Sequence, residues 1–573
     1  MEAVTSALQQ MDKSYIFVYQ SIVRYVIPIL ACILLYRCIR PLVTFRREPE
    51  IWAWICLSNG KKLPVTHWES VIGRSKRSDI VIGIPTISRN HAVLTRYDDG
   101  SWTIADADSK SGTRVNGRKI SICPLEAEDT ISIGGVEMTL QPISKRQEVR
   151  LSQIRTKASS PIRSVFNLCL LTVLQILFCF SYLLVAKIGD ASSIFAGFIG
   201  ITVFQWGMLT FYLAVKKPSF EVETLAFFLC TLGMVVISAV KPAEAVKQLI
   251  AIFLGLGLFV GLGFILRDLE YAKRVRYVAA IIGIALLLIT LVFGDEYHGA
   301  KNWLIIGSFS VQPSELSKVC FVFVGAATLD RLVNRRNLFL FILYTGIICV
   351  CLALMNDFGT ALIFFVAFLL IAYLRSGSIG TIALACSAVG FAGVLAVKIA
   401  PHALRRFEAW RHIWEDPLNT GFQQTRALMC VAAGGLFGLG AGNGWMRRVF
   451  AADSDVVFAA LAEEHGLLIS LMAVVCVLAL GFFVLRSATI GRSSFYTIGA
   501  CTAAGIYLVQ SILNTLGTVD LLPLTGVTFP FLSNGGSSMI CAWGLLAFIK
   551  AADTRQDASF SVRQSQNGRD LDE

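Results

Sequence analysis

The sequence has few charged residues and few histidines for its length, and it contains no paired cysteine motif. Only 16% of its 573 residues are charged and 6 are histidine, whereas 55% are hydrophobic and the mean hydropathy is +0.65. This composition excludes an ordinary soluble globular protein. The 15 cysteines lie mostly inside apolar runs, without a CxxC pair or a His/Cys metal spacing, which argues against a disulfide framework or a zinc module. We therefore expect a membrane to be the solvent of most of the chain.

Positive charge exceeds negative charge, and the net charge is +12. The lysines and arginines lie mainly in short loops beside apolar runs, where they normally report the orientation of membrane helices. They do not form the basic stripe of a nucleic-acid-binding surface. We therefore expect no nucleic-acid partner.

The N-terminal part of the chain divides into three segments. Residues 16–36 are apolar, lack an A-x-A-like cleavage site and are followed by arginines, which predicts a transmembrane anchor with its N-terminus outside the cell. Residues 50–142 alternate short apolar runs with Gly, Asn, Asp and Ser, which predicts a small all-β domain on the cytoplasmic side. Residues 143–164 are polar and basic and are expected to form a linker.

Residues 165–552 contain apolar runs separated by short loops and, at ~20 residues per span, predict about twelve transmembrane helices. Basic residues fall in alternate loops, which places those loops in the cytoplasm. The opposite side receives the longer loops 295–314, 399–455 and 517–534. The polar tail, residues 553–573, is expected to be cytoplasmic and disordered. The predicted fold class is thus a polytopic α-helical membrane protein with a cytoplasmic all-β domain.

The loop 399–455 carries several arginines although it is predicted to lie outside. Long translocated loops tolerate positive charge, so length alone is one explanation. The alternative is a site for an anionic ligand near the outer headgroups, because arginine is a preferred partner of phosphate. The adjoining sequence RRVFAADSDVVFAALAEEHG, residues 447–466, sets acids beside and inside an apolar helix. Charge in such a place is costly and usually functional.

Several polar stretches on the predicted outer side interrupt the apolar sequence. They are HGAKNW (298–303) with QPSELSK (312–318), NDFGT (356–360), the segment 422–455, and TGVTFPFLSNGGSS (525–538). In this order they resemble the SEDS family of FtsW, RodA and SpoVE proteins, most strongly over residues 220–552. The resemblance implies a peptidoglycan glycosyltransferase that polymerises lipid II, an undecaprenyl-pyrophosphoryl disaccharide-pentapeptide, in bacterial cell division, elongation or sporulation. It also implies a class B penicillin-binding-protein transpeptidase as partner.

The same resemblance places the family's outer-face catalytic aspartate on Asp455. The 4-hydroxyl of one disaccharide attacks the anomeric carbon of another and undecaprenyl pyrophosphate leaves, so a general base and positive charge near the diphosphate both lower the barrier. Asp455 is the expected base, and a divalent cation, Mg or Mn, can share the diphosphate. The metal ligands are unknown. The candidate substrate-binding residues are Glu315, Lys318, Arg405, Arg406, Gln423, Arg447, Arg448, Ser533 and Ser537.

Two positions near Asp455 depart from the family's pattern. The usual Pro-Glu-x-His is replaced by residues 450–453, which end in Asp453, and the usual Tyr before the late Gly-Gly is Asn534. Asp453 or Ser454 is the better candidate for capping the following helix, because Asp and Ser satisfy free N–H groups at a helix start.

Other polar residues keep two explanations each. Glu315 and Lys318, three residues apart on a helix, form a structural ion pair or belong to the substrate site. The glycines between residues 434 and 444 cradle a phosphate or permit re-entrant packing. Glu463 and Glu464 are expected to be structural, since they lie ~12 Å deeper than Asp455 at about 1.5 Å per helical residue.

Motifs in the β domain resemble a forkhead-associated (FHA) domain, a β-sandwich that binds phosphothreonine through loops at one end. They are Gly73-Arg74, Ser78-Asp79-Ile80, Ser88-Arg89-Asn90-His91, Asp106, Ser109 to Thr113 and Asn116-Gly117. The expected partner is therefore a cytoplasmic protein that contains phosphothreonine.

The resemblance also implies roles for individual residues of this domain. Arg74 and Ser88 are expected to meet the phosphate, with Arg89 or Asn90 assisting, and Asn116 or its neighbours to lie near the peptide backbone. His91 is expected to brace the loops. Ser111 stands where Asn is common, so altered affinity or phosphate-independent binding is the alternative.

Two other functions are compatible with the sequence. A polytopic bundle with an intramembrane ion pair also suits a transporter that moves lipid II across the bilayer. The altered residues around Asp453 suit a scaffold for division or elongation that keeps the fold without catalysis. Transbilayer movement without polymer would indicate the transporter.

Overall fold

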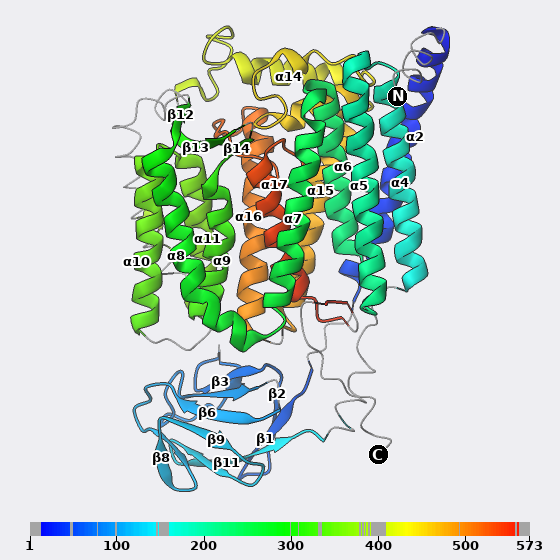
Figure 1. Cartoon of the computed structure of the whole chain (residues 1–573). Helices are drawn as coiled ribbons and strands as arrows, with labels where there is room; N and C mark the ends of the chain where they lie inside the picture. Colours follow the sequence, from blue (N-terminus) through cyan, green and yellow to red (C-terminus); the bar gives the residue numbers. More distant parts are fainter. Residues whose placement is uncertain are drawn as a thin grey trace.

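The computed structural model describes residues 13–45, 50–76, 78–97, 100–144, 147, 160–297, 300–307, 309–329, 335–376, 380, 383, 386–387, 390, 408–491, 493–555 and 558–560. The chain forms a helical bundle with a β-sandwich below one end (Figure 1). We call this end the sandwich end. Helix α14 (Phe422–Gly434) lies across the opposite end, which we call the α14 end (Figure 1).

The sandwich consists of two sheets, as the alternating sequence predicts. Its strands are β1 (Ala53–Leu57), β2 (Lys62–Val65), β3 (Glu69–Gly73), β4 (Ile80–Val81), β5 (Ala92–Arg96), β6 (Trp102–Asp106), β7 (Thr113–Val115), β8 (Arg118–Ile120), β9 (Ile122–Leu125), β10 (Thr130–Ile133) and β11 (Val136–Pro142). One sheet has the order β2-β1-β11-β10-β7-β8 and the other β4-β3-β5-β6-β9. Ile131 and Ile133 are fully buried while their neighbours on β10 are half-buried, because successive strand side chains point to opposite faces.

The bundle is built from long apolar helices. They are α2 (Lys13–Val43), α4 (Pro161–Leu183), α5 (Ile188–Ala214), α6 (Glu221–Val240), α7 (Ala245–Ile265), α8 (Leu269–Phe293), α9 (Pro313–Leu329), α10 (Arg335–Leu354), α11 (Phe358–Ser376), α15 (Val457–Ala488), α16 (Ser494–Thr518) and α17 (Gly536–Ala551). Within the described part of the chain, 9 helices are long and apolar enough to cross a membrane, and two shorter apolar helices accompany them. The predicted run 378–398 lies largely outside the described residues, so the total of about twelve stays a prediction.

The first helix is longer than the sequence predicts. Helix α2 runs from Lys13 to Val43 and keeps both Pro28 and Pro41 inside it, whereas the prediction was residues 16–36. Its apolar part, Ser14–Val43, is long enough to span a bilayer. Pro28 is buried, and proline is tolerated inside such helices where neighbouring helices and side chains satisfy the freed backbone groups.

The α14 end contains secondary structure where the sequence predicted only loops. Strands β12 (Asp295–Tyr297), β13 (Ala300–Ile306) and β14 (Phe309–Val311) form a small sheet there. Helix α14 has 13 residues, fewer than a bilayer span requires, and a short helix η2 (Met446–Arg448) follows it.

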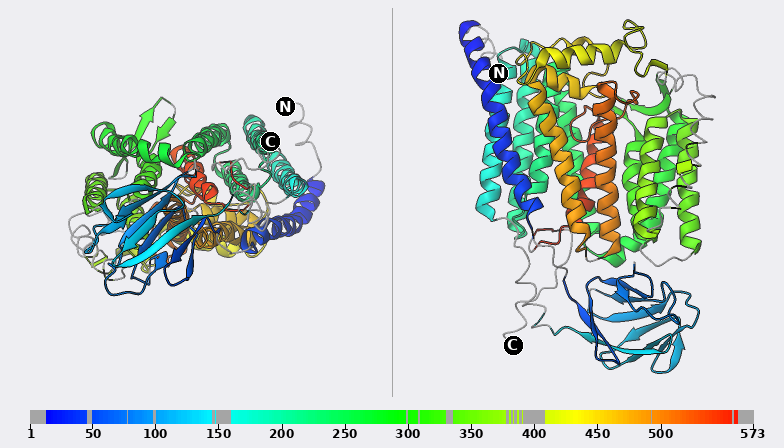
Figure 2. Two further views of the ribbon diagram at one scale, coloured as in Figure 1. Left: turned by 90° about the horizontal axis from the view of Figure 1, so that it is seen from below. Right: turned by 180° about the vertical axis from the view of Figure 1, so that it is seen from behind.

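Helices α6 and α17 lie at the centre of the bundle. Helices α2, α4 and α5, which precede residue 220, lie on one flank. Of the most apolar window of α6, 94% is buried, against 22% for α8. Figure 2 shows α2 at the periphery, beside α4. Gln175 of α4 and Gln205 of α5 hydrogen-bond to each other at 3.0 Å, and Gln175 also donates to Thr231 of α6. Paired amides of this kind hold helices together where water is absent.

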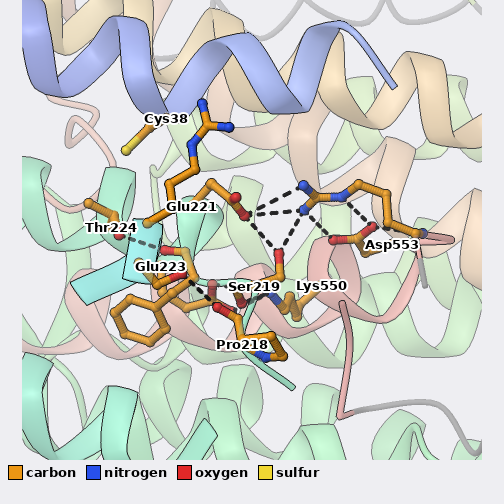
Figure 3. A network of polar contacts seen from close by, with 12 residues as sticks. Cys38, Pro218, Ser219, Glu221, Glu223, Thr224, Lys550 and Asp553 are labelled. Carbon is orange, nitrogen blue, oxygen red and sulfur yellow. Dashed lines mark hydrogen bonds and ion pairs between the residues drawn. The ribbon is translucent and has the colours of Figure 1, made fainter. Parts of the chain in front are cut away.

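The start of the C-terminal tail is folded against the sandwich end of the bundle, so the predicted disorder is wrong for the described tail residues. Asp553, Arg555 and Phe560 are at most 5% exposed. Arg555 pairs with Asp553 at 2.7 Å and with Glu221 at 3.5 Å. Figure 3 shows Glu221 and Asp553 in this network, with Lys550 and Glu223 beside them. Buried charges require such partners, and the polar composition of the tail does not reveal them.

A buried ion pair joins the sandwich to the bundle. Lys273 of α8 lies 2.7 Å from Glu69 of β3, and the two side chains are 8% and 9% exposed. The ion pair therefore links the start of α8 to the start of β3, at the opposite end of that strand from Arg74.

Candidate active site

The segment that carries Asp455 is fixed along its backbone. Asn534 donates its backbone N–H to the carbonyl of residue 453 at 2.8 Å, and the Ser533 hydroxyl donates to the carbonyl of residue 454 at 2.7 Å. The Asn514 amide donates to the carbonyls of residues 454 and 455 at 3.3 and 3.0 Å. Three consecutive carbonyls are thus held, while the Asp455 side chain is only half-buried. Buried backbone groups need such partners. Here the same hydrogen bonds also fix the position of the Asp455 backbone.

Gly526 brings a second loop against the Asp455 carboxylate. Its φ of +71° lies in the left-handed region, and a Cβ there would be 3.4 Å from Asp455 Oδ2. A side chain at this position would be strained by the backbone conformation, and its Cβ would lie in van der Waals contact with the carboxylate. The loop between α16 and α17 therefore forms one wall of the site.

The capping prediction for Asp453 and Ser454 is wrong. Helix α15 has Val456 as its N-cap residue and no side-chain cap hydrogen bond. The buried carboxylate of Asp453 instead lies 3.1 Å from the Lys241 ammonium and accepts a hydrogen bond from the Asn534 amide at 2.7 Å. The long-range partners satisfy Asp453 better than the adjacent helix start would, since they supply a charge as well as a donor.

Glu463 and Glu464 hold the glycine-rich loop, as their predicted structural role requires. Glu463 accepts the backbone N–H groups of Trp445 and Met446, both at 2.8 Å. Glu464 accepts those of Gly442 and Gly444 at 3.1 and 3.2 Å. These N–H groups are therefore occupied by carboxylates, which favours re-entrant packing over a phosphate cradle.

A break in α15 lets this loop enter the bundle. Gly466 has a φ of +87°, and a Cβ there would lie 2.3 Å from the Leu436 carbonyl oxygen. The backbone N–H groups of Leu439 and Gly440 reach the carbonyls of Glu463 and Glu464 at 2.8 and 2.9 Å. Glycine permits both the conformation and the close approach.

Glu315 and Lys318 form the predicted ion pair near the start of α9. Lys318 Nζ lies 2.8 Å from Glu315 Oε1, and the side chains are 1% and 6% exposed. Such burial is tolerated because each charge has its partner within the helix.

The QPSE motif is tied to two other predicted motifs. The Gln312 backbone N–H donates to Ser537 Oγ at 3.0 Å, and its side chain donates to Asp357 Oδ2 at 3.1 Å. Asp357 also accepts the Thr360 backbone N–H at 3.1 Å, so it caps α11. Motifs far apart in the sequence thus meet at the α14 end.

The predicted basic residues are only partly placed. Arg447 and Arg448 form part of η2 and are exposed at the α14 end. Gln423 lies on α14 and donates to the Phe450 carbonyl at 2.8 Å. Arg405, Arg406 and the motif residue His298 lie outside the described residues.

The loops at one end of the sandwich bring the predicted phosphate-binding residues together. The Arg74 backbone N–H donates to the Ser88 carbonyl at 3.0 Å, and Ser88 Oγ accepts the Lys110 backbone N–H at 3.0 Å. Arg74, Arg89 and Asn90 are exposed. Two guanidinium groups and a hydroxyl are thus available at this loop cluster, which suits a phosphate.

His91 braces these loops, as predicted. It is fully buried, and its Nδ1 accepts the Ser88 backbone N–H at 3.0 Å. Nε2 therefore carries the proton and faces the Gly112 carbonyl at 3.3 Å. Ser111 donates to the Thr86 carbonyl. Asn116, in the turn between β7 and β8, donates its amide to Asp129 and accepts the Thr130 backbone N–H.

Asp106 fixes the neighbouring loop. Ser109 and Thr113 donate their hydroxyls to Asp106 Oδ1, each at 2.6 Å, and the Ser109 backbone N–H donates to Oδ2 at 3.0 Å. Burial raises the pKa of Asp106, but these hydrogen bonds together outweigh it and lower the pKa below its usual value.

Among the described residues, no group of three or more His, Cys, Asp or Glu side chains is arranged to hold a metal ion. The described site therefore offers single carboxylates and cations, with the amides and hydroxyls that position them.

The comparisons with known proteins agree with the motifs. The sequence model of the FtsW/RodA/SpoVE family, described as cell cycle protein, matches residues 222–557, more than half of the chain, and that of the FHA domain matches residues 70–134. The chain belongs to the FtsW/RodA/SpoVE family. It is therefore a multi-pass membrane protein of this family that also carries an FHA domain.

Individual relatives share moderate sequence identity with this chain. The chain is 30% identical to the probable peptidoglycan glycosyltransferase FtsW of Wigglesworthia glossinidia brevipalpis, over 59% of this chain and 95% of that protein. It is 29% identical to the peptidoglycan glycosyltransferase RodA of Mycobacterium tuberculosis strain H37Rv, over 54% of this chain and 70% of that protein. A chain of a solved peptidoglycan synthase complex is 25% identical, with a TM-score of 0.49, over 58% of this chain and 96% of that one.

Sequence reasoning missed Lys241 as a member of the site. Lys241 follows α6 at the α14 end and pairs with Asp453 across more than 200 residues. A signal existed, because a lysine in a short loop on the predicted outer side runs against the positive-inside pattern.

Proposed function

We propose that this chain is a peptidoglycan glycosyltransferase that polymerises lipid II, with Asp455 as the general base. The supporting observation is that Asp455 projects, half-buried, from a segment whose three consecutive carbonyls are all hydrogen-bonded. A base held in this way can accept the proton of the attacking 4-hydroxyl without first being ordered.

The leaving diphosphate requires positive charge. Arg447 and Arg448, exposed in η2 at the same end of the bundle, suit this role, as do Arg405 and Arg406 by sequence. A Mg or Mn ion carried by the diphosphate would add to this charge. Glu315, Lys318, Gln423, Ser533 and Ser537 complete the proposed substrate-binding set, in part by fixing the motifs around Asp455.

In this proposal the sandwich end faces the cytoplasm and the α14 end faces outward. The loops that follow α5 and α7, with Lys216, Lys217 and Arg267, lie towards the sandwich end, in keeping with the positive-inside rule, whereas Lys241, Arg447 and Arg448 lie at the α14 end. The lipid-linked substrate is then polymerised at the outer membrane boundary. A class B penicillin-binding-protein transpeptidase would crosslink the product, during division, elongation or sporulation.

Purified full-length protein given labelled lipid II, with its transpeptidase, tests the activity. Asp455→Asn is expected to lower the rate by roughly 100- to 10 000-fold, because it removes the base and keeps the shape. Glu415→Gln, which neutralises a carboxylate that is 76% exposed just before α14, serves as the control and should not change the rate. Equal polymer from native protein and Asp455→Asn would remove Asp455 from the mechanism, and lipid II movement without polymer would indicate a transporter.

The FHA domain is proposed to read phosphothreonine on a cytoplasmic protein. A phosphothreonine peptide should bind the full-length protein, and Arg74→Ala should reduce its affinity by at least about tenfold, since a charge-assisted hydrogen bond is worth about 1.5–3 kcal/mol. Arg114→Ala, an exposed arginine on β7, is the matched control. Binding that ignores both the phosphate and Arg74 would favour phosphate-independent contacts.

A further inference from the structure

The two positions that depart from the family's pattern, Asp453 and Asn534, contact each other. Asn534 Nδ2 donates to Asp453 Oδ2 and to Glu244 Oε2, both at 2.7 Å. The Lys241 ammonium lies 3.1 Å from the other Asp453 oxygen. We call Lys241, Glu244, Asp453 and Asn534 the Asp453 unit.

The chemistry of this unit explains why the two positions need each other. Asp453 has 3% of its side chain exposed, and a carboxylate so deeply buried is tolerated only with a countercharge and hydrogen-bond donors. Lys241, 48% exposed, supplies the charge from the surface. One side chain must donate to both Asp453 and Glu244. The amide nitrogen of Asn534 has two N–H groups, whereas the tyrosine that is usual at this position has a single O–H.

The Asp453 unit acts directly on the segment of Asp455. Asn534 holds Asp453 twice, by its amide to the carboxylate and by its backbone N–H to the carbonyl. The next residue is held by Ser533, so Asp453 and Ser454 are both fastened to the same turn before α17. The backbone that leads into Asp455 is therefore held at two successive carbonyls.

We propose that Lys241, Asp453 and Asn534 are positioning residues, which set the orientation of the Asp455 carboxylate without touching the reacting atoms. This inference rests on the proposed glycosyltransferase function. It differs from a general stabilising role because it predicts a loss of turnover while substrate affinity is kept.

Steady-state polymerisation by the full-length protein with its transpeptidase tests this. Asn534→Ala should lower kcat by roughly 10- to 100-fold with KM within about twofold, since small displacements of a reacting group cost rate rather than binding. Asp453→Asn, which keeps the shape and loses the charge, should lower kcat less. The double variant should be no slower than Asn534→Ala alone, because both changes break one unit.

Asn419→Ala is the matched control. It removes an exposed amide hydrogen bond to Asp416 just before α14 and leaves the Asp453 unit intact, so kcat should be unchanged. If Asn534→Ala polymerises as fast as Asn419→Ala, the positioning role is overturned while the proposed function stands. Additive losses in the double variant, or a rise in KM with kcat unchanged, would overturn it as well.

Hydrogen exchange of residues 453–456 gives a readout that does not depend on activity. Asn534→Ala should speed exchange there and Asn419→Ala should not, and equal exchange in both variants overturns the inference. If the native protein makes no polymer, the proposed function fails and this measurement alone decides whether Asn534 fastens the segment.

Discussion

At the sandwich end of the bundle, the charged side chains around Arg555 are almost completely buried and pair with one another. At the α14 end, the Asp453 unit is partly exposed. Glu221, Glu223, Lys550, Asp553 and Arg555 are each at most 4% exposed. At the α14 end Lys241 is 48% exposed and Asp455 is half-buried. The first network is closed to solvent, whereas the second includes an exposed ammonium.

The partners in the two networks differ accordingly. Lys550 lies 3.1 Å from Glu223 and donates to the Ser219 carbonyl at 2.9 Å, while Arg555 is shared by Glu221 and Asp553 (Figure 3). The contacts with Ser219, Glu221 and Glu223 join α17 and the tail to the start of α6, while the pair of Arg555 and Asp553 lies within the tail. The closed network therefore joins the tail to the bundle, whereas the partly exposed one borders the segment that carries Asp455.

Arg555→Ala should have the largest effect on stability. It leaves Glu221 and Asp553 buried without their cation, which costs about 3–5 kcal/mol of unfolding free energy. Thermal unfolding of the detergent-solubilised full chain measures this loss. Polymerisation per folded molecule should stay near the native rate, in contrast to Asp455→Asn.

Truncation after Phe560 is the control for Arg555→Ala. It keeps Arg555 and the aromatic contact of Phe560 with Tyr212, 5.2 Å between ring centroids, and should leave the unfolding temperature unchanged. An Arg555→Ala protein as stable as this truncation would show that the buried network does not hold the tail.

Tyr182→Phe should have a smaller effect, at the α14 end. The Tyr182 hydroxyl donates to Glu464 at 2.7 Å, and a hydrogen bond to a charged group is worth about 1.5–3 kcal/mol. Tyr19→Phe is matched to it, because Tyr19 donates to the neutral Leu177 carbonyl at 3.1 Å and should cost about 0.5–1.5 kcal/mol. Unfolding measurements on both variants compare the two, and a larger loss for Tyr19→Phe would contradict the role of Tyr182 in holding Glu464.

The smallest effect concerns pH and Asp106 in the sandwich. Its pKa is lowered in the folded protein, so its stabilising contribution is complete above the unfolded value of about 3.9 and is lost as the pH falls through the folded value. Hydrogen exchange of residues 106–113 should therefore accelerate below about pH 4. Asp106→Asn should accelerate it at neutral pH and remove this dependence, and a native protein without the pH effect would contradict the assignment.

Sequence patterns predicted the parts of the fold that depend on local regularity. The alternation in residues 50–142 and the apolar runs of α4 to α11 and α15 to α17 appear as expected, since strand and helix periodicity follow from backbone geometry. The ion pair of Glu315 and Lys318 was also predictable, because residues three apart share a helix face. Helix α14 was missed, since its short run falls inside a polar loop.

The sequence by itself determined the membrane class, the FHA module and the position of Asp455, because composition and ordered motifs are properties of the linear chain. Only the tertiary structure decided which charges meet. It paired Lys241 with Asp453 and folded Arg555 of the tail against Glu221. A buried charge must find its partner in space, and the cost of leaving it unpaired is set by surroundings that no local pattern records.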